Sequence, residues 1–399
     1  MRSLLPLVLL AAAARADSLL VLPFANLSPA TDLNWVGVSL SQAVIDALTT
    51  QGIRVLDPDE REEAYRRLSI RPYARLTRAS VIKMAEALDA SQVLYGEFEL
   101  IPEGNPAPGG SRGSLRVSAR LLDVNQMRKG PEFGESAALE DLAKLEASLA
   151  WRALHSLTPQ TTPPLEEFTR ARPVVRVNAI ESYTRGLLAT TPEQKHRFFT
   201  QAVRLDDSYS QPCFELGRLY WNKKDYRLAG DWLARVKPSD SHYLEANFLL
   251  GLCRYYTADY PGAEAAFQVV ARALPLLEVA NNLGAAQSRR NLPSALDNFL
   301  KALEGEPADP DYHFNVGFVL WKAGRFAEAA DRFRAVLDRN PEDALAILML
   351  GRCLKQTGPR PGDPRSQGLE RLKLNYEERA YRELKAALEH KAPPDNPLP

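Results

Sequence analysis

Aromatic, basic and asparagine side chains recur at regular intervals in the second half of the chain, and together they carry the chemistry of peptide binding. Aromatic rings and arginines are residue types enriched at binding hot spots. An asparagine offers both a donor and an acceptor, so Asn282 and Asn315 can each hydrogen-bond a peptide backbone. The candidate set is Arg218, Trp221, Asn222, Tyr255, Tyr256, Asn282, Arg289, Asn315, Phe318, Trp321, Lys322 and Arg352.

The charged residues at these periodic positions are mostly basic. Lys355 adds to the four basic residues of the candidate set, and Glu215 is the one acidic residue. A basic surface favours a peptide ligand that carries acidic groups or a free C-terminus, and we expect a ligand of that kind. The alternative interpretation is that the aromatic rings pack between structural repeats and the charges are only solvated.

The elements that must position these side chains are marked by glycines that recur inside apolar helical patterns. They are Gly186, Gly217, Gly251, Gly284, Gly317 and Gly351, at steps of 31, 34, 33, 33 and 34 residues. This pattern resembles the tetratricopeptide repeat, whose period is about 34 residues. The resemblance implies stacked helix pairs, a concave groove lined by the first helix of each pair, and a groove location for the candidate residues. No repeat can bury its apolar face alone, so neighbouring repeats must stack.

We expect about five to six helix pairs between residues 176 and 358. The sixth repeat keeps its first helix and then meets a run rich in proline and glycine at residues 358–364. The polar stretch from Leu369 to Glu389 then predicts a capping helix within a C-terminal segment of residues 359–390. Residues 391–399 are predicted to be a disordered tail.

The first half, residues 17–157, predicts a compact α/β domain. Apolar runs at residues 18–24, 53–56, 93–100 and 115–124 indicate strands, and helical spacing appears at 35–51, 80–88 and 139–157. Asp57 and Glu60 have the spacing of a capping box at the start of another helix, with Pro58 in its first turn. Four prolines then favour an extended, semi-rigid linker at residues 158–175.

Several short motifs in this half resemble the TolB-type N-terminal domain. They are Val-Leu-Pro-Phe-Ala-Asn-Leu-Ser at 21–28, Trp-Val-Gly at 35–37, Val-Leu-Tyr-Gly-Glu at 93–97 and Val-Ser-Ala-Arg-Leu-Leu-Asp at 117–123. The resemblance implies a non-enzymatic domain of the bacterial cell envelope. The β-propeller that follows this domain in TolB has no counterpart here, so the role of TolB is not transferred.

The N-terminus predicts export. A short basic start, an apolar run from Leu4 to Ala14 and the sequence Ala14-Arg15-Ala16 are typical of a signal peptide at residues 1–16. We therefore expect a secreted or periplasmic protein, cleaved near Ala16, and no other stretch predicts a membrane span. Cys213, Cys253 and Cys353 are odd in number and lie within apolar helical patterns, so we interpret them as buried packing residues.

Composition and motifs favour some classes of function over others. Fifty basic residues balance fifty acidic ones, which argues against nucleic acid as a partner, although residues 17–157 carry 15 basic and 19 acidic residues. No metal-ligand spacing or catalytic motif occurs, so we predict no cofactor and no enzymatic activity. The favoured function is a scaffold or adaptor that binds a protein or peptide. The alternatives are an assembly or secretion factor acting on cell-wall or outer-membrane machinery and, less favoured, an envelope enzyme with its site in the α/β domain.

Overall fold

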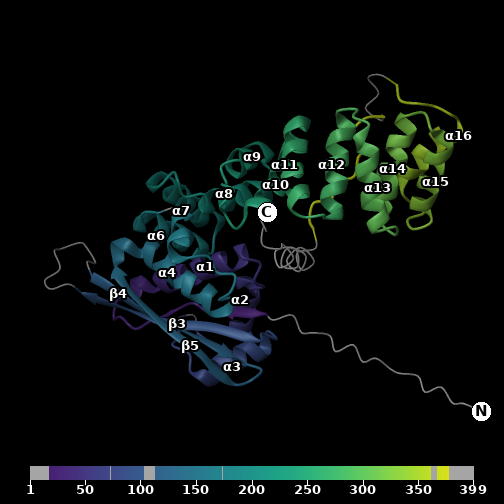
Figure 1. Cartoon of the computed structure of the whole chain (residues 1–399). Helices are drawn as coiled ribbons and strands as arrows, with labels where there is room; N and C mark the ends of the chain where they lie inside the picture. Colours follow the sequence, from purple (N-terminus) through teal and green to yellow (C-terminus); the bar gives the residue numbers. More distant parts are fainter. Residues whose placement is uncertain (1–17, 72, 103–112, 173, 361–365, 377–399) are drawn as a thin grey trace, which may run out of the picture. The chain divides into compact units, whose positions relative to one another are not determined.

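The computed structural model describes residues 18–71, 73–102, 113–172, 174–360 and 366–376. The chain forms two compact units that meet in sequence at Thr162 and Pro163 (Figure 1). The first unit is a mixed sheet with helices, and the second is a run of consecutive helices. The fold class is thus an α/β domain followed by an all-α tetratricopeptide repeat solenoid.

The sheet of the first unit has the strand order β1-β3-β4-β5, with β2 also paired to β3. Strands β1 and β2 lie parallel to β3, whereas β3, β4 and β5 form an antiparallel meander. The bounds are β1 Leu19–Val21, β2 Ala25–Asn26, β3 Gln92–Pro102, β4 Gly113–Asp123 and β5 Arg128–Ala138.

Helices cover this sheet and complete its core. Side chains of α2 and α3 pack on Leu20, Val93 and Leu122 of the sheet, and α4 contacts β5. The predicted capping box is confirmed, because Asp57 accepts from the backbone at the start of α2 and the Glu60 side chain accepts from the backbone of Asp57. The bounds are α1 Asn34–Thr50, α2 Pro58–Arg67, α3 Arg78–Ala87 and α4 Leu142–Leu157.

Two local predictions need correction, and one strand was not predicted. Residues 53–56 form only an isolated bridge between Val55 and Leu19. Strand β5 was not predicted, because its side chains are half-buried or exposed and leave no apolar alternation in the sequence. The predicted linker is not extended throughout, since it contains the short helix α5 (Leu165–Arg170), which buries Phe168.

The second unit continues with antiparallel helix pairs, each packed on the next. In Figure 1 they follow one another from teal to yellow along the chain. Their bounds are α6 Val177–Leu188, α7 Pro192–Leu205, α8 Gln211–Asn222, α9 Tyr226–Leu233, α10 Tyr243–Tyr256, α11 Tyr260–Ala273, α12 Leu277–Arg289, α13 Ser294–Gly305, α14 Pro310–Lys322, α15 Phe326–Leu337 and α16 Ala344–Leu354.

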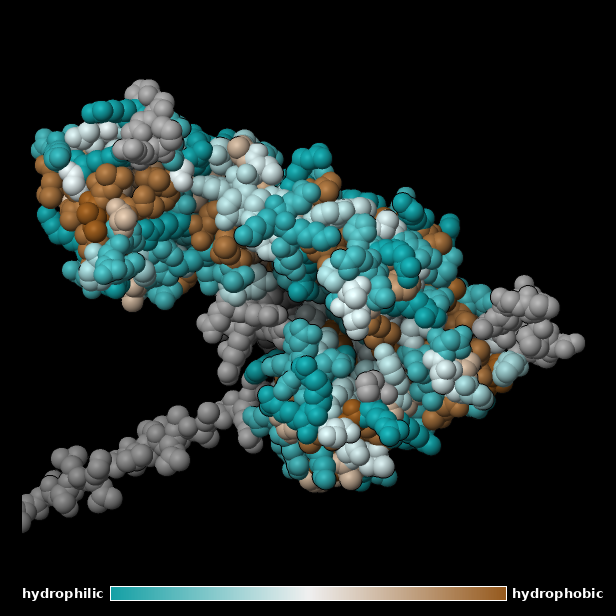
Figure 2. All heavy atoms as spheres, turned by 180° about the vertical axis from the view of Figure 1, so that it is seen from behind, coloured by the Kyte–Doolittle hydropathy of each residue, from teal (hydrophilic) through white to brown (hydrophobic). Residues whose placement is uncertain are grey.

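The periodic glycines allow the two helices of a pair to approach closely. A Cβ atom on Gly251 would lie 2.6 Å from the ring of Phe267 in α11, and one on Gly284 would lie 2.9 Å from the ring of Phe299 in α13. Gly351 in α16 is different, because no described atom lies within 4 Å of the position of its Cβ. Helix α16 also exposes Ile347 and Leu354, at 52% and 64%. Hydrophobic surface is visible at this end of the solenoid in Figure 2.

The C-terminal segment differs from its prediction. Residues 369–376 form no helix. The rest of the predicted capping helix lies outside the described residues, as do the signal peptide and the tail. The three cysteines are buried free thiols, which confirms their interpretation as packing residues.

Two glycine substitutions test the packing of the helix pairs. Gly251→Ala forces the ring of Phe267 to move, and we expect it to lower the free energy of unfolding by about 1–3 kcal/mol. Gly351→Ala meets no neighbour and improves helix propensity, so we expect a gain of up to about 1 kcal/mol. Denaturant titration followed by circular dichroism measures both. If both variants lost the same free energy of unfolding, close packing of the helix pairs would not explain the periodic glycines.

A buried carboxyl group makes the first unit sensitive to pH. Glu146 of α4 is 9% exposed, and its carboxyl accepts a hydrogen bond from the Ser39 hydroxyl of α1. Burial raises the pKa of Glu146 to about 7, against the hydrogen bond from Ser39, which lowers it. Because the folded pKa exceeds the unfolded one, its stabilising effect is complete below about pH 4.5 and is lost as pH rises through about 7.

We therefore expect the first unit to lose about 3 kcal/mol between pH 4.5 and pH 8. Glu146→Gln keeps the shape of the side chain and removes the ionisation, so its stability should stay level over that range. Thermal melts of both proteins at several pH values provide the measurement. A variant that retains the wild-type pH dependence would assign the effect to another group.

Candidate functional site: the surface of the repeats contacted by residues 366–376

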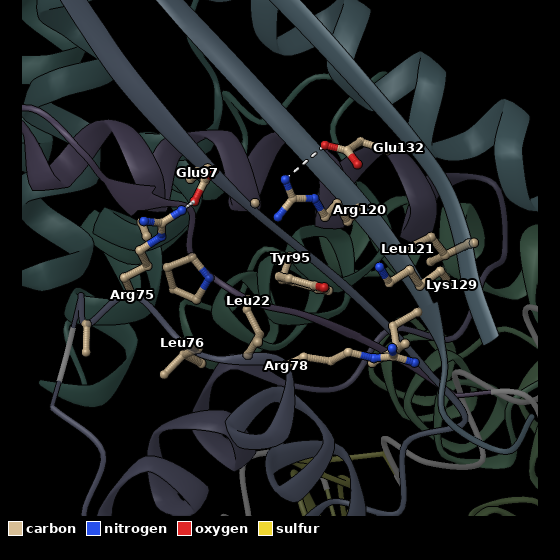
Figure 3. Close-up of a pocket in the computed structure, with 16 residues that line it drawn as sticks. Leu22, Arg75, Leu76, Arg78, Tyr95, Glu97, Arg120, Leu121, Lys129 and Glu132 are labelled. Atoms are coloured by element: carbon tan, nitrogen blue, oxygen red, sulfur yellow. Dashed lines mark ion pairs between the residues drawn. The ribbon is translucent and has the colours of Figure 1, made fainter. Parts of the chain in front are cut away.

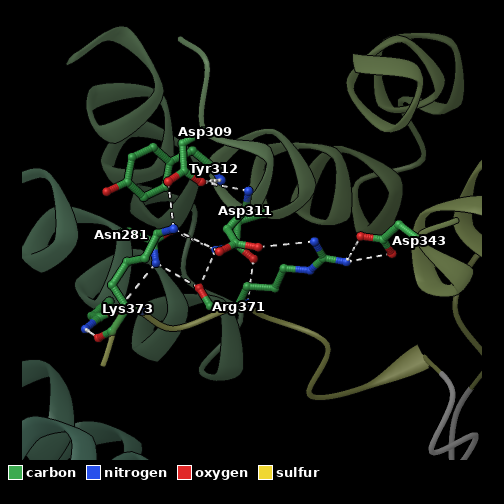
Figure 4. Close-up of polar contacts among 9 residues, drawn as sticks. Asn281, Asp309, Asp311, Tyr312, Asp343, Arg371 and Lys373 are labelled. Carbon is green, nitrogen blue, oxygen red and sulfur yellow. Dashed lines mark hydrogen bonds and ion pairs between the residues drawn. The ribbon is translucent and has the colours of Figure 1, made fainter. Parts of the chain in front are cut away.

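The segment from Ser366 to Tyr376 lies along the first helices of successive repeats. Its main chain at Arg371 and Lys373 bonds to side chains of α14 and α12, and Tyr376 contacts Phe248 of α10 with ring centroids 5.1 Å apart. The segment therefore runs from α14 towards α10, against the order of the repeats. Figure 4 shows Arg371 and Lys373 surrounded by side chains of the solenoid.

Asparagines of two neighbouring repeats hold this main chain. Asn315 of α14 donates to the carbonyl of Arg371 and accepts from its N–H, both at 2.8 Å. Asn282 of α12 does the same for Lys373, at 2.7 Å to the carbonyl and 2.8 Å from the N–H. Asn281 donates to the carbonyl of Arg371 as well, at 2.8 Å, and accepts from Asn315. All three asparagines are 0% exposed, so the segment supplies hydrogen bonds that buried amides require.

A row of aspartates binds the two basic side chains of the segment. Arg371 pairs with Asp343 at 2.7 Å and with Asp311 at 3.2 Å, and its guanidinium lies 3.8 Å from the centroid of the Phe314 ring. Lys373 pairs with Asp309 at 2.7 Å and with Asp311 at 2.8 Å. We call Asp309, Asp311 and Asp343 the acidic row.

The ionisation of these groups reflects their pairing. Burial lowers the pKa of Lys373, but hydrogen bonds to Asp309 and Asp311 outweigh it and leave the pKa raised. Burial raises the pKa of Asp343, and hydrogen bonds from the Ala346 backbone and Arg371 reverse this to a lowered pKa. Both shifts favour the charged forms, so the ion pairs persist across the neutral range.

The acidic residue of the segment occupies a different subsite. The carboxylate of Glu370 accepts from the Ser288 hydroxyl at 2.7 Å and from the Tyr255 hydroxyl at 3.3 Å, and Glu370 is only 8% exposed. Lys322 donates to the carbonyl of Ser288 at 2.7 Å. Burial lowers the pKa of Lys322, and the charge of Glu370 acts against that shift. We call Tyr255, Ser288 and Lys322 the hydroxyl–lysine subsite.

Apolar contacts join the segment to the solenoid core. Leu372 packs against two buried clusters, one centred on α14 and the other on α10 and α12. Leu369 packs against the α14 cluster, and Tyr376 packs against the α10 cluster. Alternate side chains of the segment face different sets of residues, as in an extended chain. We call the surface of α10, α12 and α14 that contacts residues 366–376 the groove.

The candidate residues from the sequence divide into three groups. Asn282, Asn315 and Tyr255 form hydrogen bonds with residues 370–373, and Lys322 donates to Ser288, which itself bonds Glu370. Phe318 and Trp321 are instead buried in the core, at 1% and 0% exposed. These two rings therefore fit the alternative interpretation, in which the aromatic residues pack between repeats. The remaining candidates do not contact the segment through a hydrogen bond or ion pair given by the structure, apart from the close approach of Arg289 to Gly368.

Those remaining candidates have identifiable neighbours. Arg289 donates to the Tyr260 hydroxyl at 2.6 Å, and the guanidinium of Arg352 lies 5.6 Å from the centroid of the Trp321 ring. Trp221 and Tyr256 form an aromatic cluster with Tyr226, in which the Tyr226 and Tyr256 rings stack at 4.6 Å. Arg218 and Asn222 are exposed on α8.

The acidic row was missed by sequence reasoning. Asp309 and Asp343 cap α14 and α16, so their positions are explained by helix starts alone. The signal that could have found them is their spacing of 34 residues, one full repeat, together with Asp311 two residues after the first. The groove thus has an acidic wall as well as the predicted basic positions.

The first unit holds a cavity of about 450 Å³ on its sheet. Figure 3 shows Arg75 beside Glu97 and Arg120 beside Glu132 in its lining. Arg75 pairs with Glu97, and Arg120 pairs with Glu132, each at 2.9 Å. Arg78 donates to the carbonyl of Met127 at 2.8 Å. Because these charged groups already have partners within the first unit, the groove is the better-supported binding site.

Comparison with known proteins supports the repeats. The family model described as "Tetratricopeptide repeat" matches residues 285–330 and 319–358. The second unit therefore contains tetratricopeptide repeats. No curated protein matches the chain.

Solved structures similar to the chain are of low identity. YrrB, described as a tetratricopeptide protein with an unusual peptide-binding site, is 21% identical over 42% of this chain and 87% of its own, with a TM-score of 0.34. MamA from Desulfovibrio magneticus is 21% identical over 42% and 96%, with a TM-score of 0.36. The C-terminal domain of LpoB from Salmonella enterica is 17% identical over 31% and 82%, with a TM-score of 0.24.

Among the residues that the structure describes, no helix has the length and apolar character needed to cross a membrane. The same residues contain no group of three or more histidine, cysteine or acidic side chains placed to hold a metal ion.

Release of the segment can be measured by proteolysis. Trypsin cleaves after arginine and lysine, and the groove holds the main chain at Arg371 and Lys373, so cleavage there should be slow. Replacing both Asn282 and Asn315 by alanine removes the main-chain contacts, and we expect cleavage at these two sites to become at least tenfold faster, corresponding to about 1.4 kcal/mol.

Asn222→Ala is the matched control, because Asn222 is an exposed asparagine of α8, whereas Asn282 and Asn315 are buried in α12 and α14. Mass spectrometry of the fragments identifies each cut. If the double variant and the control are cut at the same rate, the two asparagines do not hold the segment in solution.

Proposed function

We propose that this protein is a scaffold or adaptor that binds an extended peptide of a partner protein in the concave groove of its repeats. The observation that carries the proposal is the way Asn282 and Asn315 each bond both the N–H and the carbonyl of one residue of an extended chain. Such bonds recognise main chain irrespective of sequence. The subsites on either side supply selectivity through charge and shape.

The aromatic cluster gives the groove a second point of attachment. Tyr256 is 43% exposed and its ring lies 6.3 Å from that of Trp221. Tyrosine and tryptophan bury large areas at low cost in conformational entropy, which suits them to anchor a partner. A ligand that extends from α12 past α10 towards α8 would contact these rings.

The cellular setting is also part of the proposal. The resemblance of the first half to the TolB-type N-terminal domain and the signal-like N-terminus support a secreted or periplasmic protein. In that setting the α/β unit docks on envelope components while the repeats hold the peptide. An assembly or secretion factor of the cell envelope is a special case of the same function, and differs only in the identity of the partner.

Site-specific photocrosslinking in cells tests this function. A photoreactive amino acid at Asn222 or Tyr256 should capture one distinct partner protein, and mass spectrometry identifies it and shows whether the mature chain begins at Asp17. The control position is Lys301, an exposed residue of α13, which is the second helix of its pair and does not belong to the groove. If the groove positions and Lys301 capture the same proteins, the groove is not the binding surface.

A further inference from the structure

We propose that residues Glu370–Lys373 are an internal copy of the groove's ligand and keep the groove closed until a partner displaces them. The ligand is then an extended peptide of another protein with an acidic residue followed by a basic, an apolar and a second basic residue. This inference rests on the proposed function and specifies its ligand class and its regulation.

The spacing of the contacts indicates a site built for an extended chain. Asn282 and Asn315 stand 33 residues apart, at equivalent positions of adjacent repeats, and bind residues 373 and 371. Two residues of an extended chain span about 6.6 Å, and their main-chain groups point the same way. Neighbouring repeats therefore bind every second residue of the peptide. The peptide runs in the direction opposite to the order of the repeats.

The side chains alternate between two walls of opposite character. Arg371 and Lys373 face the acidic row, where each makes two ion pairs. Glu370 faces the hydroxyl–lysine subsite. Because charged side chains that are largely removed from water need partners, a peptide with the opposite charge order would leave charges unpaired at both walls.

The segment competes with any outside ligand because it belongs to the same chain. A tethered ligand has an effective concentration on the order of millimolar. If its intrinsic dissociation constant were roughly 10 µM, the tether would weaken a competing peptide by about a hundredfold. The same segment from a second copy of this protein would have no advantage over the tethered one, so the displacing peptide comes from a different protein.

Fluorescence anisotropy with the full-length protein tests the proposal. The probe is a fluorescein-labelled synthetic peptide with the sequence of residues 366–376. The released variant carries Arg371→Glu and Lys373→Glu, which place like charges against the acidic row without altering any described helix. We expect the released variant to bind the probe at least tenfold more tightly than wild type does.

The acidic row is tested by variants that preserve helix capping. Asparagine caps helices about as well as aspartate, so Asp311→Asn and Asp343→Asn remove charge while keeping the start of α16 capped. A second probe carries glutamate at both basic positions. We expect the released variant to bind the first probe at least tenfold more tightly than the second. Adding Asp311→Asn and Asp343→Asn to the released variant should abolish this preference. This ratio of affinities is independent of residual competition by the segment.

The outcomes separate this inference from the proposed function. Equal binding of the probe by wild type and the released variant would show that the segment does not close the groove. A released variant that binds neither probe but still yields a groove-specific crosslink would overturn the ligand class and leave the scaffold function intact. Exchange of segments between copies would appear as a dimer in sedimentation analysis, and would contradict closure within one chain.

Discussion

The second unit depends on one constraint: amide groups buried in its groove must be hydrogen-bonded. Asn281, Asn282 and Asn315 are 0% exposed, and each points polar atoms at the surface where the segment lies. An unsatisfied buried polar group costs about 1–3 kcal/mol. The main chain at residues 371 and 373 meets this requirement with bonds of 2.7–2.8 Å. The segment that excludes water from these amides therefore also supplies their hydrogen bonds, so burying them leaves no polar group unsatisfied.

Helix capping and ligand recognition share the same carboxylates. Asp309 uses one oxygen to accept from the backbone at the start of α14 and the other to bind Lys373. Asp343 accepts from the Ala346 backbone and also binds Arg371. The starts of α14 and α16 thus bring negative charge to one edge of the groove, whereas α12 begins after Leu276 and has no acidic cap.

The repeats could be predicted from the sequence because their packing imposes a period on it. Gly251 and Gly284 face aromatic rings of the partner helix, so a larger residue is disfavoured at these positions, although packing within the described residues does not require glycine at Gly351. The main-chain role of Asn282 and Asn315 also follows from residue type and repeat position. In contrast, Trp321 has the same residue type and spacing as a groove residue but lies in the core, and its indole N–H donates to the carbonyl of Thr357.

The conformation of residues 369–376 could not be predicted, because local pattern competes there with distant contacts. Leu369, Leu372 and Tyr376 have spacing compatible with a helix. Main-chain hydrogen bonds with Asn282 and Asn315 instead hold the segment extended, together with the ion pairs of Arg371. These partners lie 28 to 91 residues away in the sequence. Strand β5 escaped prediction for the opposite reason, since its mostly polar residues carry little signal of their own and depend on pairing with β4.

The path of the segment has a consequence for how the solenoid unfolds. In a simple repeat array each unit contacts only its neighbours, so its ends can fray independently of the middle. Here one stretch of chain touches α10, α12, α14 and, through Asp343, the start of α16. It adds contacts to those that neighbouring repeats already make with each other, and it links α10 with α14 and the start of α16. Because the segment contacts three repeats at once, opening any one of them also breaks contacts of the segment with that repeat.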